Sequence, residues 1–535
     1  MLSYKIQMEA PMMSAPKSVL YGDQLPLGLE AKAQKKLFFP TTGDLYTPSG
    51  NKTIRIDVNY DGMLDTQQSF LQFTLKNKTG QISAFDIGQS VIKKLTISSA
   101  GTILEEIQDY NTLYAGILFP SQAGDQTLGY ESMNQTGINF ETSLNLPSSA
   151  NNLTNTNANK PTTIAAGDIT TAIADTSTAD RSAQIKTAIA EAVLIQSNKL
   201  MAQGDGSGSI RNTLNSLTDG GATSLSGGSR SQLFYSPVSA GQDANGGTFN
   251  GALANDESVV VNYKLVSGLL DNDKYLPLVL MNAGITIEIE LADAVECMCA
   301  DRATPPDYEI TGVRYVGHTI DLQRDFYDRL RMVQQGSGGV LQIVGQSFRS
   351  FRAQLPAGTN GVVELNCPAR VRSIKSFFFG MRKNGTDAQQ FNLSGFGHSN
   401  LRSYQLQIGA TRYPPTANKF DFKNNKVGGY TELMKAFGKV GSTTHRDLLL
   451  CNYATQEGHA LANAKTDLIP FCPFGIDLES FRHQIENGID TSSRALPIQL
   501  ILDSNPTTSA RDVYMYVLFD TIFYINMDGS VSVST

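Results

Sequence analysis

Hydrophobic and polar residues alternate along much of this chain, which is the pattern of β-strands that bury one face. The clearest case is Ile285–Leu291, where four aliphatic residues alternate with Thr286, Glu288 and Glu290. The alternation also runs through four other segments: 53–58, 70–75, 496–502 and 513–519. Strands of this kind, spread over the whole length, predict an all-β protein.

Helical periodicity is rarer and confined to short segments. Asp109 precedes an apolar segment at 110–118 and is expected to act as the N-cap of a helix there. In 325–334, apolar residues fall at positions i, i+4 and i+7, which predicts an amphipathic helix. The expected architecture is therefore a β protein with a few short packing helices.

The order of the elements repeats, which predicts two similar units in one chain. Three pairs of segments match in the same order: the strand near Leu95 with 404–408, the helix at 110–113 with 430–433, and the Leu-Pro segments 276–280 and 496–500, both expected to be strands. The helix and the Leu-Pro segment are about a hundred residues further apart in the first unit than in the second. The first unit should therefore carry an insertion.

The composition changes where that insertion is expected. Residues 121–231 are rich in Ser, Thr, Asn, Ala and Gly. Polar segments of this kind cannot bury enough apolar surface to form a core or a stable interface. We therefore expect a long loop insertion at 121–231, exposed on the outside of any assembly.

Composition and charge exclude several classes of protein. The 535 residues are 41% hydrophobic and 17% charged, which excludes general disorder, and the formal net charge of −7 argues against a dedicated nucleic-acid binder. The sequence has no run of ~20 apolar residues for a membrane span, and its first residues lack the apolar core of a secretory signal. We therefore expect a soluble protein made in the cytosol, with its five cysteines reduced.

The segment 57–68 follows the spacing of an EF-hand calcium loop, with side-chain oxygens at positions 1, 3 and 5 and glycine at position 6. Gln68 stands where that loop requires a bidentate glutamate, and the flanking segments read as strands rather than helices. Asp61-Gly62 between two strands more simply forms a turn, with Gly62 supplying a positive φ. The sequence therefore favours a turn over a calcium site.

Two further pairs of residues are candidates for chemistry. Glu288 and Glu290 lie two positions apart on one face of a strand, and this spacing overlaps the separation of the two catalytic carboxylates in glycosidases. Any strand with a solvated face, however, presents acidic residues in this way. Cys297 and Cys299 have no second pair of zinc ligands nearby. The five histidines show no metal-ligand spacing: His318, His398, His445, His459 and His483.

The remaining motifs also favour structural explanations. The glycine-rich segments lack the residue order and the strand-to-helix context of a P-loop. Phe377–Phe379 reads as a buried strand rather than a platform for stacking bases. We therefore predict no catalytic residues, no cofactor-binding residues and no metal ligands.

The segments around the Leu-Pro motifs resemble a known family. Residues 274–280, running into 285–291, are similar to the end of the first barrel in the double-jelly-roll major capsid proteins of tailless icosahedral double-stranded DNA viruses. The second half is most similar to the polinton-like virus, adintovirus and virophage branch, through 403–409, 413–414, 471–478 and 489–493. The resemblance covers most of 50–118 and 259–535.

The resemblance implies two consecutive eight-stranded jelly-roll barrels, with an N-terminal arm at 1–50, a first barrel at 51–305 and a second at 306–535. It implies a structural protein without enzymatic activity, whose homotrimers are pseudo-hexameric and tile the shell of a virion. The implied partners are further copies of the chain, a single-jelly-roll penton protein and minor capsid proteins, without sequence-specific nucleic-acid binding. Synthesis and assembly are implied in the cytoplasm or nucleus of a host cell.

A carbohydrate-binding or host-attachment β-sandwich would share the alternation and the polar loops, so it remains open as an alternative. The chain contains no Trp, the usual residue for stacking on sugars, and no secretory signal, which both count against this class. An enzyme built on a β scaffold is the third hypothesis, and the sequence gives it the least support.

Overall fold

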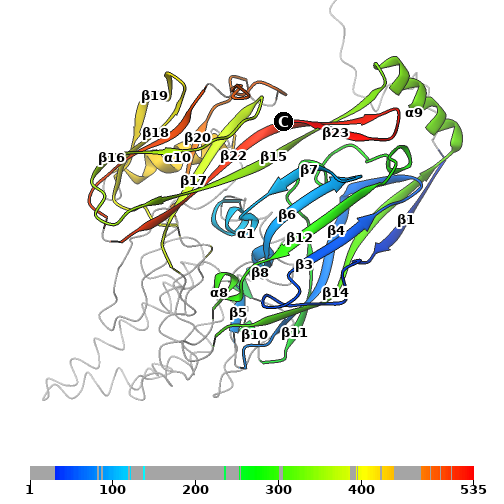
Figure 1. The fold of residues 1–535 in the computed structure, drawn as a ribbon, viewed down its shortest axis with the longest axis horizontal. Coiled ribbons are helices and arrows are strands. Elements are labelled where there is room, and N and C mark those ends of the chain that lie inside the picture. Colours follow the sequence, from blue (N-terminus) through cyan, green and yellow to red (C-terminus); the bar gives the residue numbers. More distant parts are fainter. Residues whose placement is uncertain are drawn as a thin grey trace, which may run out of the picture.

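A computed structural model gives the arrangement of the chain (Figure 1). The described residues are 30–80, 83–85, 88–118, 121, 137–138, 234–235, 252–253, 255–299, 305–385, 393, 396–421, 425–438, 472–481, 484–493, 496–507 and 509–535. Almost all of the predicted insertion at 121–231, and residues 1–29 of the predicted arm, lie outside this set.

The first unit consists of eight principal strands in two layers. In chain order these are β1 (Ala31–Phe38), β3 (Thr53–Val58), β4 (Met63–Asn77), β6 (Ile92–Ser99), β7 (Thr102–Ile107), β11 (Ser258–Tyr263), β12 (Ile285–Leu291) and β14 (Tyr308–Leu322). One layer has the hydrogen-bonded order β1-β14-β4-β11 and the other β3-β12-β6-β7, with all pairs antiparallel. The first strand therefore lies beside the eighth and the second beside the seventh, which is the winding of a jelly roll.

The second unit repeats this winding. Its principal strands are β15 (Val340–Leu355), β16 (Gly361–Asn366), β17 (Ile374–Lys383), β18 (Leu401–Ile408), β19 (Thr411–Lys419), β20 (Phe474–Asp477), β21 (Ile498–Ser504) and β22 (Arg511–Asn526). Its layers are β15-β22-β17-β20 and β16-β21-β18-β19, so each strand has a counterpart at the same place in the first unit. The predicted duplication and the predicted fold of two consecutive eight-stranded jelly rolls are confirmed.

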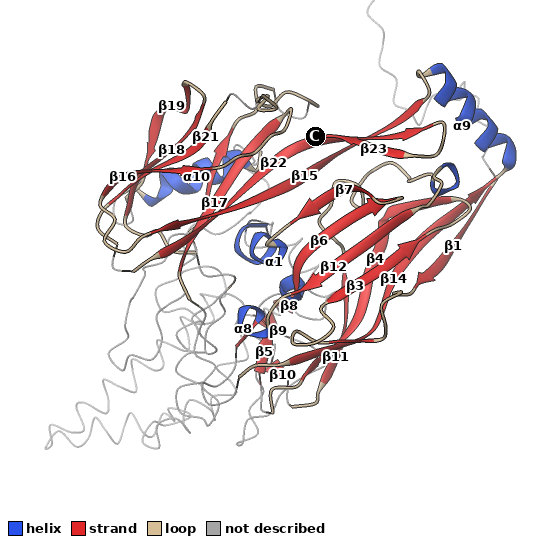
Figure 2. Cartoon of the chain, in the orientation of Figure 1, coloured by secondary structure: helices blue, strands red, loops and turns tan. Residues whose placement is uncertain are grey.

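Short elements complete the structure (Figure 2). The helical ones are Gly88–Val91, α1 (Tyr110–Leu113), the π-helical turn Tyr114–Leu118, Leu278–Leu280, α8 (Ala294–Cys297), α9 (Arg324–Gly336) and α10 (Lys426–Ala436). The short strands are β2 (Leu45–Tyr46), β5 (Ser83–Phe85), β8 (Gly137–Ile138), β9 (Phe234–Tyr235), β10 (Ala252–Leu253), β13 (Met298–Cys299) and β23 (Val531–Ser534).

The alternation in the sequence produces the core between the two layers of each barrel. In β12, the aliphatic residues are buried whereas Glu288 and Glu290 are exposed. In β17, Phe377, Phe378 and Phe379 are all fully buried, because the strand is covered on both faces. The ring of Phe379 stacks on Phe474, while the Phe378 ring packs 4.6 Å from that of Phe437, which follows α10. The prediction of a buried strand at Phe377–Phe379 is confirmed.

The insertion lies between the fifth and sixth strands of the first barrel. That connection runs from Ile107 to Ser258, whereas its counterpart in the second barrel runs only from Lys419 to Phe474. A helix follows the fifth strand in both units, as the match of 110–113 with 430–433 predicted. The extra length expected in the first unit is therefore found in this one connection.

The sheets divide the chain differently from the boundaries predicted at 50/51 and 305/306. β1 and β2 pair with β14, so residues 31–46 of the predicted arm belong to the first barrel. β14 also pairs with β4, which makes it the eighth strand of the first barrel, and α9 then links the two units. β1 carries almost no alternation because it is an edge strand in which residues 31–35 are exposed and only Phe38 is buried, so the sequence AKAQKKLF gives no strand signal.

Two local predictions need correction. Residues 276–280 do not form a strand: Leu276 makes an isolated bridge to Leu64, and a 3₁₀ turn follows, so β12 is the counterpart of β21. Asp109 precedes α1, but its side chain makes no capping hydrogen bond and its φ of 46° is left-handed. The amphipathic helix predicted at 325–334 is confirmed as α9.

Candidate functional site: the junction between the two barrels

The two barrels meet where the backbone of the first unit touches the first strand of the second. A Cβ atom built on Gly345, in β15, would lie 2.1 Å from the carbonyl oxygen of Gly268. A Cβ atom on Gly268 would lie 2.8 Å from the carbonyl oxygen of Gln346. Neither glycine has a positive φ, so the space between the two backbones, and not conformational freedom, requires glycine at both positions.

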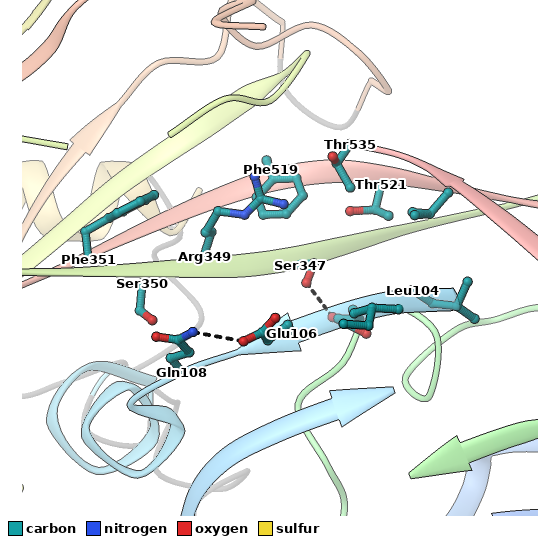
Figure 3. Close-up of a pocket in the computed structure, with 13 residues that line it drawn as sticks. Leu104, Glu106, Gln108, Ser347, Arg349, Ser350, Phe351, Phe519, Thr521 and Thr535 are labelled. Atoms are coloured by element: carbon teal, nitrogen blue, oxygen red, sulfur yellow. Dashed lines mark hydrogen bonds between the residues drawn. The ribbon is translucent and has the colours of Figure 1, made fainter. Parts of the chain in front are cut away.

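Glu105 in β7 ties three segments of this junction together. Its carboxylate accepts hydrogen bonds from Ser267 Oγ at 2.5 Å and from the Gly268 amide at 2.9 Å. Across the junction it accepts a third from Ser347 Oγ at 2.5 Å, the dashed line that starts at Ser347 in Figure 3. The side chain is buried, and this burial raises the pKa of Glu105 above its ordinary value, although the hydrogen bonds oppose the shift.

We expect Glu105 to make the stability of the protein depend on pH. Because its pKa is higher in the folded than in the unfolded chain, the folded state binds the proton more tightly. The contribution of this residue is therefore greatest at acidic pH and decreases as the pH rises from about 4.5 through the folded pKa. Thermal unfolding of the wild type and of E105Q across this range should show a difference that changes with pH, whereas parallel curves would contradict the assignment.

Further contacts fix the angle between the barrels. Asn272 Nδ2 donates to the Val344 carbonyl at 2.6 Å, and the hydroxyl of Tyr516 donates to the Asp109 carbonyl at 3.1 Å. A Cβ on Gly116 would lie 2.4 Å from the ring of Phe396, so the π-helical turn of the first unit packs tightly on the second. The junction therefore joins the barrels at several points and holds them as one body.

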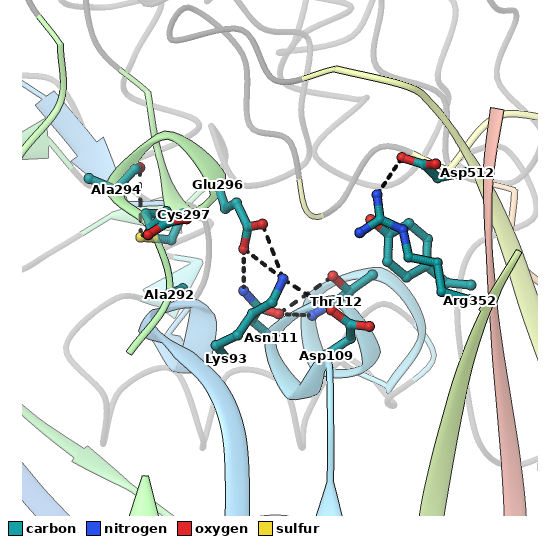
Figure 4. Close-up of polar contacts among 12 residues, drawn as sticks. Lys93, Asp109, Asn111, Thr112, Ala292, Ala294, Glu296, Cys297, Arg352 and Asp512 are labelled. Carbon is teal, nitrogen blue, oxygen red and sulfur yellow. Dashed lines mark hydrogen bonds and ion pairs between the residues drawn. The ribbon is translucent and has the colours of Figure 1, made fainter. Parts of the chain in front are cut away.

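An ion cluster supports the helix at this junction (Figure 4). Lys93 Nζ lies 3.0 Å from Asp109 Oδ1 and 2.9 Å from Glu296 Oε2. Burial lowers the pKa of Lys93, but the two carboxylates raise it by more, so its pKa lies above the ordinary value and the ammonium stays charged. The cluster thus joins β6 to α8 and to the residue that precedes α1, with one ammonium shared between two carboxylates.

A groove of 470 Å³ runs along the junction between β7, β15, β22 and β23. Figure 3 shows Glu106, Gln108 and Arg349 around it. Gln108 Nε2 donates to Glu106 Oε1 at 2.8 Å, and this bond, with Lys94, lowers the pKa of Glu106. Arg349 lies 5.3 Å from the centre of the Phe519 ring, and burial lowers its pKa. These polar groups therefore already have partners within the same chain.

In the structure, the candidate calcium loop at 57–68 spans the connection between two strands of different layers. β3 ends at Val58 and β4 begins at Met63, so Asp61-Gly62 forms the turn that the sequence favoured. Gly62 does not have the positive φ expected of it. A Cβ there would instead lie 2.7 Å from the ring of Tyr60 and 3.0 Å from the carbonyl oxygen of Ile320, so a close approach explains the glycine.

The described part of the structure does not bring the other candidate residues together into a site. Glu288 and Glu290 are exposed on β12, as a solvated face predicts. Cys297 is a buried thiol that donates to the Asp293 carbonyl. In the part of the chain that the structure describes, no three His, Cys, Asp or Glu residues are arranged to hold a metal ion. Cys451, His445, His459 and His483 lie outside the described residues.

Comparisons with solved structures give likenesses over nearly the whole chain. PBCV-1 VP54, fitted into a cryo-EM reconstruction of the virophage Sputnik, is similar with a TM-score of 0.50 and 9% identity, over 96% of this chain and 99% of that one. A chain of the cryo-EM structure of the Sputnik virophage is similar with a TM-score of 0.50 and 10% identity, over 100% of this chain and 94% of that one. At this identity the likeness establishes the shared double-jelly-roll fold.

Sequence comparisons add no relative. No protein-family model matches the chain, and no curated protein matches its sequence. Among the described helices, none has the length and apolar character needed to cross a membrane.

Proposed function

We propose that this chain is the major capsid protein of a tailless icosahedral double-stranded DNA virus, and that three copies of it form a pseudo-hexameric capsomer. The observation that carries this proposal is the pair of jelly rolls with identical strand order in one chain, joined by close backbone and hydrogen-bond contacts. The fold shared with PBCV-1 VP54 and with a chain of the Sputnik virophage structure supports it.

Two similar barrels in each chain allow a three-fold assembly to pack like a six-fold one. A ring of three chains then contains six similar barrels, so a three-fold assembly acquires an approximately six-fold outline that can pack on a flat lattice. A rigid junction is necessary for this, because any change in the angle between the barrels would alter the angle at which the ring closes. The function is assembly, and no step of catalysis is part of it.

The same proposal covers location and partners. The protein would lie in the capsid shell of the virion, after synthesis in the cytoplasm or nucleus of a host cell. It would contact copies of itself within and between trimers, a single-jelly-roll penton protein at the vertices, and minor capsid proteins.

Light scattering after size-exclusion chromatography, followed by negative-stain imaging, tests the proposal. We expect a species of three times the 57.9 kDa chain mass, with a hexagonal outline. A stable monomer or an elongated particle at all concentrations would contradict it and would favour the attachment-protein alternative.

A further inference from the structure

Three charged side chains meet in the second barrel. Lys375 lies in β17, Asp520 in β22 and Glu479 in the segment that follows β20. Their side chains are 5%, 2% and 16% exposed. Lys375 Nζ lies 3.2 Å from Asp520 Oδ1 and 3.0 Å from Glu479 Oε1. An amine and two carboxyl groups are therefore in contact at a site that water hardly reaches.

A β-bulge places Lys375 beside Asp520. Ile374 pairs with Phe519 and Ser376 with Leu518, so Lys375 is an extra residue of β17 at an irregularity of the ladder. Bulges turn a side chain out of the regular alternation and are frequent next to active sites. Lys375 Nζ also donates to the Gln484 carbonyl at 2.9 Å, which fixes the position of the amine.

The two oxygens of the Asp520 carboxylate have different surroundings. Oδ2 accepts hydrogen bonds from Ser373 Oγ at 3.0 Å and from the Glu486 amide at 2.8 Å, and the Gly488 amide in turn donates to Ser373 Oγ at 3.1 Å. Two fixed donors can stabilise the negative charge that an oxygen gains when a nucleophile attacks its carbon. Oδ1, beside the amine, is then the oxygen that leaves.

The position of Glu479 fits the role of a general base. Among the described residues, only Lys375 is placed to donate to the Glu479 carboxylate, so nothing there would stabilise a tetrahedral intermediate on Glu479 itself. Its Oε1 lies within hydrogen-bond distance of the amine, as proton transfer requires. Asp520 is therefore the electrophile of the two carboxyl groups, and Glu479 can carry a proton from the nitrogen to the leaving oxygen.

We propose that Lys375 and Asp520 condense to an amide that joins β17 to β22 covalently. One ammonium proton passes to Asp520 Oδ1, and the neutral amine attacks the Asp520 carboxyl carbon. The nitrogen then gives a second proton to Glu479, which passes it to Oδ1. The bond between the carbon and Oδ1 breaks, and Oδ1 leaves as water. The nitrogen keeps the third proton, Glu479 ends as a carboxylate, and no group is oxidised or reduced.

Contact and burial both favour this reaction. Well-oriented groups in one molecule react as though present at about 10⁵–10⁸ M. The condensation also removes one positive and one negative charge from a buried site, where ionised groups are costly. The ion pairs of Lys375 are the state from which the bond forms, and chains that have not reacted keep them.

The amide would tie the third strand of the second barrel to its eighth strand. A covalent link between these positions restricts the unfolded chain as a disulfide does, but thiol reductants cannot break it. The inference concerns the chemistry of a single chain, so it does not depend on the proposed function.

Intact-mass spectrometry of the full-length protein, aged after purification and then denatured, tests the proposal. We expect a wild-type species that is lighter than the sequence mass by one water molecule and that accumulates with time. Proteolysis should release a branched peptide joining Lys375 to Asp520. A wild type that keeps its sequence mass would overturn the proposal. A water lost at another position, such as a succinimide at Asp61-Gly62, would overturn it as well.

Three variants test the roles of the groups. K375A has no amine and should keep the mass of its sequence. E479Q retains both reacting groups without the base, so it should react at least about 100-fold more slowly. E486Q is the matched control, because Glu486 takes part through its backbone amide and its side chain is 46% exposed, so it should react like the wild type. Equal rates in E479Q and the wild type would contradict the role of Glu479. Melting temperatures verify that the variants fold, and the wild-type mass decides the proposal without them.

Discussion

Replacing Gly345 with alanine is expected to destabilise the protein by about 3 kcal/mol, at the upper end of the range for overpacking substitutions. The added Cβ would lie 2.1 Å from the carbonyl oxygen of Gly268 and 2.7 Å from its carbonyl carbon. Both are backbone atoms, so no side chain can rotate away, and the two barrels would have to separate. Chemical denaturation followed by tyrosine fluorescence would measure the loss in the free energy of unfolding.

The separation would also weaken the polar contacts beside the glycine. The bonds from Ser347 to Glu105 and from Asn272 to the Val344 carbonyl both involve residues within two positions of Gly345. G336A is the matched control, because a Cβ on Gly336, at the end of α9, meets no atom within 4 Å. G336A should change stability by no more than about 1 kcal/mol. Equal stabilities of G345A and G336A would contradict this prediction. They would show that the backbones at Gly345 and Gly268 can move apart without a loss of stability.

The strands of the core could be predicted from sequence because their burial is periodic and local. β12 is buried on one face only, so Ile285, Ile287 and Ile289 mark it without any knowledge of its partners. Phe377–Phe379 was recognisable for the opposite reason, since an unbroken aromatic run fits a strand covered on both faces. The duplication followed from the order of such elements rather than from any single match.

Edge strands and the junction gave no such signal. Most of β1 is exposed, from Ala31 to Lys35, so its lysines resemble those of an unstructured arm. Glu105 sits in TILEEI, where a glutamate beside Glu106 looks like part of a solvated strand face. Its carboxylate is enclosed by Ser267 and Gly268 of the same barrel and by Ser347, 242 residues later in the chain, so only tertiary packing reveals its burial. Contacts between units are set by tertiary geometry, which local periodicity does not encode.

K375A is expected to lose about 3–5 kcal/mol, the usual effect of leaving a buried charge without its partner. The side chains of Lys375 and Asp520 are only 5% and 2% exposed, and Lys375 Nζ lies 3.2 Å from Asp520 Oδ1 and 3.0 Å from Glu479 Oε1. Without the ammonium, two carboxylates would face each other in a region that water hardly reaches. Chemical denaturation would measure the loss in the free energy of unfolding.

An exposed ion pair of the same barrel provides the control for K375A. Arg402 and Asp503 are 45% and 28% exposed, so R402A should change stability by no more than about 1 kcal/mol. The double variant K375M/D520L should recover part of the loss, because it removes both charges together. In K375A, the amides of Gly488 and Ile489 should also exchange faster with deuterium, since the loop that they anchor loses the bond from Lys375 to Gln484. Unchanged exchange with reduced global stability would show that the ion pairs of Lys375 stabilise the barrel without shaping the loop from Gln484 to Ile489.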